Sequence, residues 1–190
     1  MRRMMFAAAA VLALAACNQQ GGGGPALPTL QAGAQAPSTQ TPPTGEVTQI
    51  QISDENRRMV EANVTDLLNQ IGEGAARGAT PPEGFQERIV ALQPGTDSRF
   101  VISLTGGTNY SFIGACDADC SNVDIELIDM TTGGVVGSDM LDDDYPVVHY
   151  APQANGDYMV RLLMQTCTQA PCYTAARVLA HPTTAGEAGK

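Results

Sequence analysis

The hydrophobic positions of this chain repeat with a helical period up to about residue 71 and with a period of two after about residue 88. One helical face would carry the apolar side chains Val60, Val64, Leu67, Leu68 and Ile71. Ser53 is a suitable N-cap, because its side chain can accept a hydrogen bond from the first turn. Gly72 favours termination, since glycine readily adopts the left-handed conformation that follows many helices. The pattern predicts one amphipathic helix over residues 53–71.

The second half of the chain is predicted to consist of short β-strands, because apolar and polar residues alternate along it. These strands cover residues 88–92, 99–104, 110–114, 123–129, 135–136, 147–150, 157–166 and 173–180. In the fourth, Val123, Ile125 and Leu127 are expected to face the core. Asp124 and Glu126 are expected to face outward. Short strands with turn residues and no helix between them predict a mainly β protein, an antiparallel β-sandwich rather than an α/β fold.

The first residues have the features of a bacterial export signal. Arg2 and Arg3 precede an apolar run over residues 4–16, which is too short to span a bilayer comfortably. The run leads into the sequence LAAC, which matches the lipobox of bacterial lipoproteins and ends in Cys17. We therefore expect residues 1–16 to be removed as a signal peptide and Cys17 to be lipidated. A plain secretory signal is the alternative.

The segment after Cys17 is expected to be a disordered tether. Residues 18–45 contain no charged residue and are rich in Gly, Pro, Gln and Thr, a composition that cannot bury a core. They would reach on the order of 30 Å as a coil and about 85 Å when extended. The expected divisions are the lipidated cysteine and linker (17–45), a helix and loop (46–84), the β-sandwich (85–182) and a flexible tail (183–190).

The protein is acidic, with a net charge of −10. Loss of Arg2 and Arg3 with the signal peptide leaves 8 Lys and Arg residues against 20 Asp and Glu residues, a net charge of −12. Nucleic acid and anionic headgroups repel such a protein, so we expect no nucleic-acid partner and a membrane contact through the lipid anchor. Asn18, rather than aspartate, follows Cys17, and the sorting rule of Gram-negative lipoproteins then predicts delivery to the outer membrane, facing the periplasm or the cell surface.

Four further cysteines predict two disulfides, because an even number in an exported chain typically pairs. Three turn-like residues separate Cys116 from Cys120, and four separate Cys167 from Cys172. This spacing favours two local bridges, Cys116–Cys120 and Cys167–Cys172. Two long-range bridges between the segments are the alternative.

Three motifs within residues 88–180 resemble those of the bacterial pre-peptidase C-terminal domain. They are LTGGTNY at residues 104–110, VDIELID at residues 123–129 and NGDYMVRL at residues 155–162. The resemblance implies a jelly-roll β-sandwich that is non-catalytic, is associated with secretion and binding surfaces and, in some relatives, with calcium. That domain typically accompanies secreted enzymes such as proteases, whereas this sequence has no protease domain beside the sandwich. The role played for an attached enzyme therefore does not carry over.

The sequence lacks three common catalytic motifs. His-Glu-x-x-His, Gly-x-Ser-x-Gly and the Walker A loop are all missing from it. The two histidines, His149 and His181, are each expected to be satisfied within the fold or to face solvent. We therefore expect a non-catalytic, lipid-anchored cell-envelope protein whose β-sandwich is a binding or structural module, with an envelope protein or a glycan as its partner. An accessory subunit or chaperone for an exported enzyme is the alternative, and an unrecognised hydrolase is a third class.

Carboxylates gather in two parts of the β-rich region. One group lies in the loop after Asp139, and the other surrounds the first cysteine pair. Calcium takes roughly six to eight oxygen ligands, and crowded carboxylates repel one another unless a cation is present. The candidate ligands of a weak calcium site are Asp117, Asp119, Asp124, Asp142 and Asp144. A solvated acidic loop is the alternative, and no other cofactor is expected.

Overall fold

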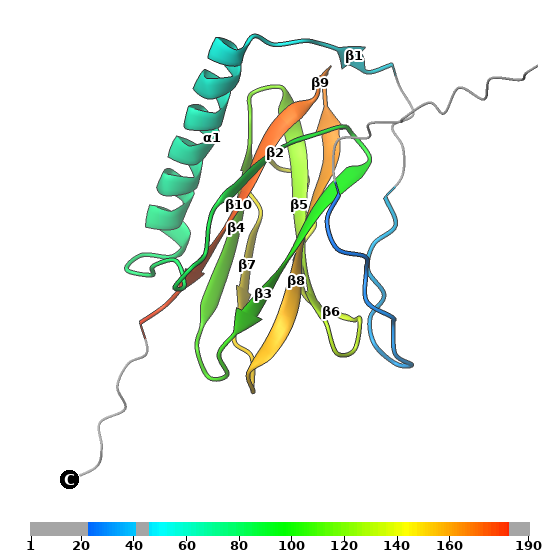
Figure 1. Ribbon diagram of the computed structural model, residues 1–190, viewed down its shortest axis with the longest axis vertical. Helices are drawn as coiled ribbons and strands as arrows, with labels where there is room; N and C mark the ends of the chain where they lie inside the picture. The colour runs from blue at the N-terminus through cyan, green and yellow to red at the C-terminus, as the bar shows by residue number, and fades with distance from the viewer. Residues whose placement is uncertain (1–22, 41–45, 183–190) are drawn as a thin grey trace, which may run out of the picture.

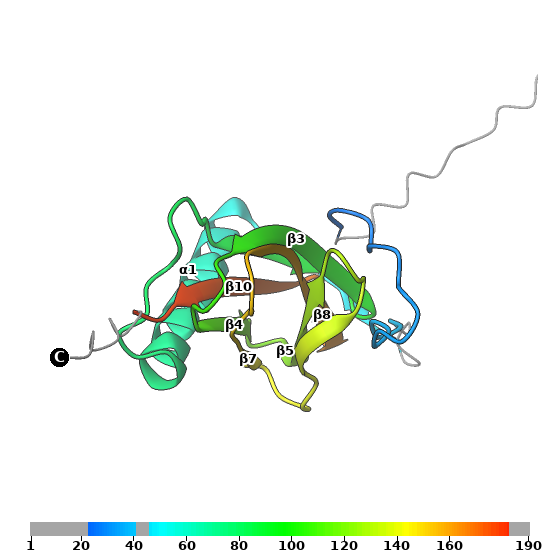
Figure 2. The ribbon, with the colours of Figure 1, turned by 90° about the horizontal axis from the view of Figure 1, so that it is seen from below.

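The computed structural model of the protein describes residues 23–40 and 46–182 (Figure 1). The expected signal peptide over residues 1–16, the lipidation residue Cys17 and the tail over residues 183–190 lie outside the described residues. In the described part, an N-terminal segment, two β-sheets and one helix lie in successive layers (Figures 1 and 2).

The two sheets each contain four strands that pair antiparallel with their neighbours. The helix-side sheet has the order β2 (Arg88–Leu92), β10 (Cys172–Ala180), β4 (Tyr110–Cys116), β7 (Val147–Tyr150). The second sheet, called the strap-side sheet because residues 23–40 lie against it, has the order β3 (Thr96–Leu104), β8 (Gly156–Cys167), β5 (Cys120–Asp129), β6 (Val135–Asp139). This order is that of a jelly roll, in which the chain crosses repeatedly between two packed sheets. The predicted antiparallel jelly-roll-type β-sandwich is therefore confirmed.

Alternate residues of the two sheets fill the core between them. Val123, Ile125 and Leu127 of β5 are fully buried, as the alternation predicted. They belong to the same cluster as Phe112 of β4 and Val160 of β8. Burial of each such side chain stabilises the fold by about 1.5–3 kcal/mol relative to exposure, so this cluster sets which face of each strand points inward.

Helix α1 (Asp54–Ala75) covers the outer face of the helix-side sheet (Figure 1). Its N-cap is Ser53, as predicted, because the Asn56 amide donates a hydrogen bond to the Ser53 Oγ at 3.2 Å. Val64 and Leu68, from the predicted apolar face, are fully buried against the sheet. The predicted face and start of the helix are confirmed.

The predicted helix end at Gly72 is wrong by about one turn. The helix continues to Ala75, and the amide of Ala76 still donates to the Gly72 carbonyl at 2.9 Å. Ala76 is itself buried against the sheet. Packing of this last turn therefore outweighs the local preference of glycine to end a helix.

Two very short strands were not expected from the sequence. β1 (Thr48–Gln49) pairs in parallel with β9 (Gln169–Ala170), and the Ile50 amide extends the pairing by donating to the Ala170 carbonyl at 2.8 Å. Two residues are too few to produce a periodic pattern. This pairing holds the segment before α1 against the loop closed by Cys167 and Cys172.

The prediction of a disordered tether is wrong for residues 23–40, which we call the strap. The strap lies outside the strap-side sheet, on the opposite side of the molecule from α1 (Figures 1 and 2). Gly23 exchanges two backbone hydrogen bonds of 2.9 Å with β3, one to the Asp97 carbonyl and one from the Arg99 amide. Farther along, Gln35 accepts a hydrogen bond from the Val135 amide of β6 at 2.9 Å.

Glycines allow the strap to approach this closely. A Cβ atom at Gly24 would lie 2.1 Å from the Arg99 carbonyl oxygen, and one at Gly133 would lie 2.5 Å from the Thr29 carbonyl oxygen. Real Cβ atoms do not approach oxygen so closely, so both positions require glycine. Composition alone predicted disorder, because the contacts of the strap depend on sandwich residues that are distant in the sequence.

Candidate functional site

The strap covers a network of buried charges on the strap-side sheet. The guanidinium of Arg161 forms ion pairs with Asp97 at 2.6 Å and with Glu126 at 2.9 Å, and it also donates to the Ser38 carbonyl at 2.7 Å. The Ser38 amide and hydroxyl donate to the other oxygen of Glu126, at 2.8 and 2.6 Å. Removal of one partner from a buried ion pair is strongly destabilising, because it leaves an uncompensated charge. The contacts of Ser38 with Arg161 and Glu126 therefore hold the strap against the sheet.

Glu126 and Asp124 point away from the core, as predicted, yet both side chains are buried. Each is 2% exposed. Glu126 is covered by the strap, and the Gln165 side chain donates to Asp124 at 2.6 Å. The alternation identified the face correctly and could not show that a second segment covers it.

Asp124 is the most perturbed carboxyl group near the acidic loop. Its pKa is raised to about 6, chiefly by burial and also by repulsion from Asp139, Glu126 and Asp143, while the Gln165 hydrogen bond acts in the opposite direction. Its Oδ1 has no hydrogen-bond partner among the described residues. Burial likewise raises the pKa of Asp117, a candidate calcium ligand within the loop closed by Cys116 and Cys120.

Both disulfides are the local ones that the spacing favoured. Cys116 is bonded to Cys120, with Cα atoms 5.9 Å apart, and Cys167 to Cys172, with Cα atoms 6.0 Å apart. Cys120 and Cys167 face each other in the β5–β8 register, so the two bridges lie side by side. The long-range alternative is wrong, and the bridges shape two adjacent turns at one end of the sandwich.

The candidate calcium ligands are not arranged as a cation site. Asp117 accepts from the Tyr173 amide at 2.7 Å, Asp119 from the Gln169 side chain at 2.9 Å, and Asp142 from the Asn122 side chain at 2.9 Å. Asp124 accepts from Gln165, and the Asp144 carbonyl lies 4.0 Å from the Cys116 sulfur. Within residues 23–40 and 46–182, no group of three or more His, Cys, Asp or Glu side chains is placed to hold a metal ion. In this geometry Asp117, Asp119, Asp124 and Asp142 instead join neighbouring segments through hydrogen bonds.

The acidic loop also exposes large apolar side chains. Leu141 is 66% exposed and Tyr145 is 56% exposed, on either side of the three consecutive aspartates. Asp139 holds the loop at its start, because its carboxylate accepts from the Leu141 amide at 3.3 Å and from the Val147 amide at 2.8 Å. The exposed apolar groups are thus presented on a loop whose backbone is fixed.

This loop borders the edge of helix α1. A cavity of about 260 Å³ is lined by Leu67, Gln70, Ile71, Ala115, Asp144 and Tyr145. Leu67 belongs to the predicted apolar face but remains 38% exposed. We call residues 140–145 together with Leu67 and Ile71 the loop–helix surface. It combines an apolar floor with a carboxylate rim.

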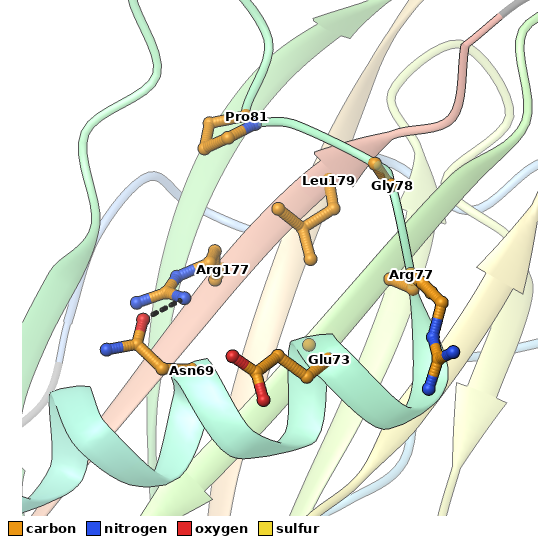
Figure 3. A pocket seen from close by; sticks show the side chains of 10 residues that line it. Asn69, Glu73, Arg77, Gly78, Pro81, Arg177 and Leu179 are labelled. Carbon is orange, nitrogen blue, oxygen red and sulfur yellow. Dashed lines mark hydrogen bonds between the residues drawn. The ribbon is translucent and has the colours of Figure 1, made fainter.

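A larger cavity of about 570 Å³ lies between α1 and β10 (Figure 3). Arg177 of β10 crosses it and donates to Asn69 of α1 at 2.8 Å, while its Nε donates to Glu87 at 2.6 Å. The carboxylate of Glu73 points along α1 toward the side of the cavity where Asn69 lies (Figure 3). Since its guanidinium is already paired on both sides, Arg177 serves to join the helix to the sheet.

The two histidines meet at one buried hydroxyl group. Ser111 of β4 is fully buried, and its Oγ lies 2.9 Å from His149 Nδ1 and 2.7 Å from His181 Nε2. The sequence around each histidine does not show that the two converge. Their convergence could be predicted from their positions on one face of neighbouring strands only if the order of the strands in the sheet were known.

A comparison with protein-family models and a search of curated proteins find no match to this chain. The resemblance to the pre-peptidase C-terminal domain therefore stays a prediction. Among the described residues, no helix combines the length and apolar character needed to cross a membrane.

Proposed function

We propose that this protein is a non-catalytic lipoprotein of the bacterial outer membrane whose β-sandwich binds a partner in the cell envelope. The observation that carries the proposal is the docked strap. Its first described residue, Gly23, follows the expected lipidation residue Cys17 by only six positions. Six residues span at most about 20 Å. The sandwich would therefore be held close to the membrane.

A docked strap also gives the sandwich a preferred orientation. The strap lies on one outer face of the molecule, and α1 covers the opposite face (Figures 1 and 2). An anchor joined to the strap brings the strap-side sheet toward the membrane. The face that carries α1, with the loop–helix surface at its edge, is then turned toward possible partners.

The chemistry of the loop–helix surface fits a basic, amphipathic protein segment. Leu141, Tyr145 and Leu67 offer apolar contact, and stable interfaces typically bury such groups at their centre. The aspartates between Leu141 and Tyr145 attract positive charge, in a loop with no Lys or Arg. A partner with an apolar centre and flanking Lys or Arg residues would satisfy both features.

Site-specific photocrosslinking in the native envelope tests the partner surface. A photoreactive residue at Leu141 should give a discrete crosslinked protein, whereas one at Val101, which is 42% exposed on β3, should not. Reversing the charge with Asp142→Lys and Asp144→Lys should remove the product. Equal products at both positions, or a product insensitive to charge reversal, would contradict the proposed surface. Capture of an exported enzyme would favour the accessory-subunit role.

Fractionation tests the anchor separately. Wild-type protein should sediment with outer membranes, and Cys17→Ser should accumulate as the unprocessed precursor. A Cys17→Ser protein that is still cleaved and released into the soluble fraction would show that Cys17 is not the anchor.

A further inference from the structure

His149 and His181 lie on the outer face of three neighbouring strands. Ser111 of β4 stands opposite His149 of β7 in one register and opposite Leu179 of β10 in the other. His181 follows the end of β10, and its amide donates to the Asn109 carbonyl at 2.9 Å. The backbone pairing of β7, β4 and β10 therefore brings both imidazoles to the same place.

The shared hydroxyl gives the two imidazoles unequal roles. Ser111 has one hydroxyl hydrogen, so its Oγ can donate to only one of the two ring nitrogens. The other nitrogen must carry a hydrogen and donate to Oγ. The nitrogen that accepts from Ser111 therefore carries a lone pair. The other nitrogen gains one when its imidazole changes tautomer. The distance between His149 Nδ1 and His181 Nε2 cannot exceed the sum of their distances to Ser111 Oγ, 2.9 and 2.7 Å.

The imidazoles are accessible from solvent. They line a cavity of about 450 Å³ together with Asn109, Tyr110, Tyr150 and Ala151. His149 is exposed and His181 is half-buried, whereas Ser111 is fully buried. A small ion can therefore reach both imidazoles, and the exposed position of His149 leaves its ring room to rotate.

We propose that His149 Nδ1 and His181 Nε2 together bind a divalent transition-metal cation, copper(II) most tightly. Neutral imidazole is the commonest protein ligand of such cations, and among divalent first-row metals copper(II) binds nitrogen ligands with the highest affinity. The cation replaces the hydrogen bonds of the Ser111 hydroxyl, and water completes its coordination. This site differs in place and chemistry from the carboxylates considered for calcium, and it does not depend on the proposed membrane anchor.

Titration of copper(II) into the full mature chain in detergent, followed by calorimetry and electron paramagnetic resonance, tests the site. The wild-type protein should bind one copper(II) with nitrogen hyperfine structure from two imidazoles. His149→Asn and His181→Asn should each weaken binding by at least about tenfold, as loss of a ligand requires. The double variant measures any binding by other groups. Ser111→Ala should retain the site, because the hydroxyl is not a ligand.

A second measurement needs no substitution and so does not depend on the folding of a variant. Copper(II) broadens nuclear magnetic resonance signals close to it, and we expect selective broadening at residues 109–111, 149–151 and 181. Broadening centred on the acidic loop, or single histidine variants with unchanged affinity, would overturn the proposal.

Discussion

At the scale of single residues, the burial of Asp124 has a clear energetic consequence. Its pKa in the folded protein is about 6, above the value of 3.8 expected for an unfolded chain. The folded state therefore holds the proton more tightly, and ionisation of this group opposes folding as the pH rises from about 4 to about 6. Above that range the full destabilisation is present, whereas below it none remains.

Asp124→Asn should stabilise the protein at neutral pH. An amide oxygen can still accept the hydrogen bond from Gln165, and no buried charge remains. The melting temperature of the variant should exceed that of the wild type at pH 7, and the difference should disappear as the pH falls to about 4. Thermal unfolding between pH 4 and pH 8 measures this. A variant that is less stable at pH 7, or a difference that does not change with pH, would show that Asp124 has a necessary ionised role.

At the scale of elements, the docked strap depends on the absence of a side chain at Gly133. Gly133→Ala should displace the strap, because the new methyl would meet the Thr29 carbonyl. Gly107→Ala is the matched control: Gly107 also has a positive φ, 79° against 70° for Gly133, but a Cβ there meets no atom within 4 Å. Both variants carry similar backbone strain, of roughly 1 kcal/mol.

Hydrogen exchange measures the displacement. The Gln31 and Val135 amides form hydrogen bonds between the strap and the sandwich. Both amides should exchange faster in Gly133→Ala than in Gly107→Ala. Limited proteolysis should likewise cut residues 23–40 faster. Equal exchange and cleavage in the two variants would mean that the strap is not held by this close approach.

The two disulfides each join the ends of two strands, Cys116–Cys120 between β4 and β5 and Cys167–Cys172 between β8 and β10. Each closes a loop of only a few residues, so its effect on the entropy of the unfolded chain is about 2 kcal/mol at most. Replacing Cys167 and Cys172 with alanine should lower the free energy of unfolding by no more than that, and should speed exchange of the Ile50 amide, which bonds to the loop that they close. The same change at Cys116 and Cys120 should leave Ile50 unaffected. Equal effects on Ile50 would contradict a local role.

Elements with a local sequence pattern could be predicted from the sequence. Features that depend on contact with another segment could not. The strands β2 and β7 have the predicted bounds, and the local disulfides follow from short spacing. The strap was missed because it has no periodic pattern. It is held by close approaches that require glycine and by buried charges of the sandwich. The convergence of His149 and His181 was missed because it depends on which strands are neighbours.

At the scale of the whole molecule, the layers and the expected anchor combine into one arrangement. The strap and its sheet lie on one side, and the helix-side sheet and α1 lie on the other (Figure 1). If the anchor is at Cys17, the strap side faces the membrane at short range and the α1 side faces away. A long flexible tether would instead let the sandwich sample all orientations.

Energy transfer from single tryptophans to labelled lipids tests this arrangement most directly, since the chain contains no tryptophan of its own. Leu27→Trp places a donor on the strap, and Met59→Trp places one on α1; the native side chains are 40% and 55% exposed. In vesicles with an acceptor on the lipid headgroups, the lipidated Leu27→Trp protein should transfer energy more efficiently than the lipidated Met59→Trp protein. Gly133→Ala should reduce the difference. Protein that fails to bind vesicles would refute the anchor alone, whereas vesicle-bound protein with equal or greater transfer from Met59→Trp would contradict the proposed arrangement.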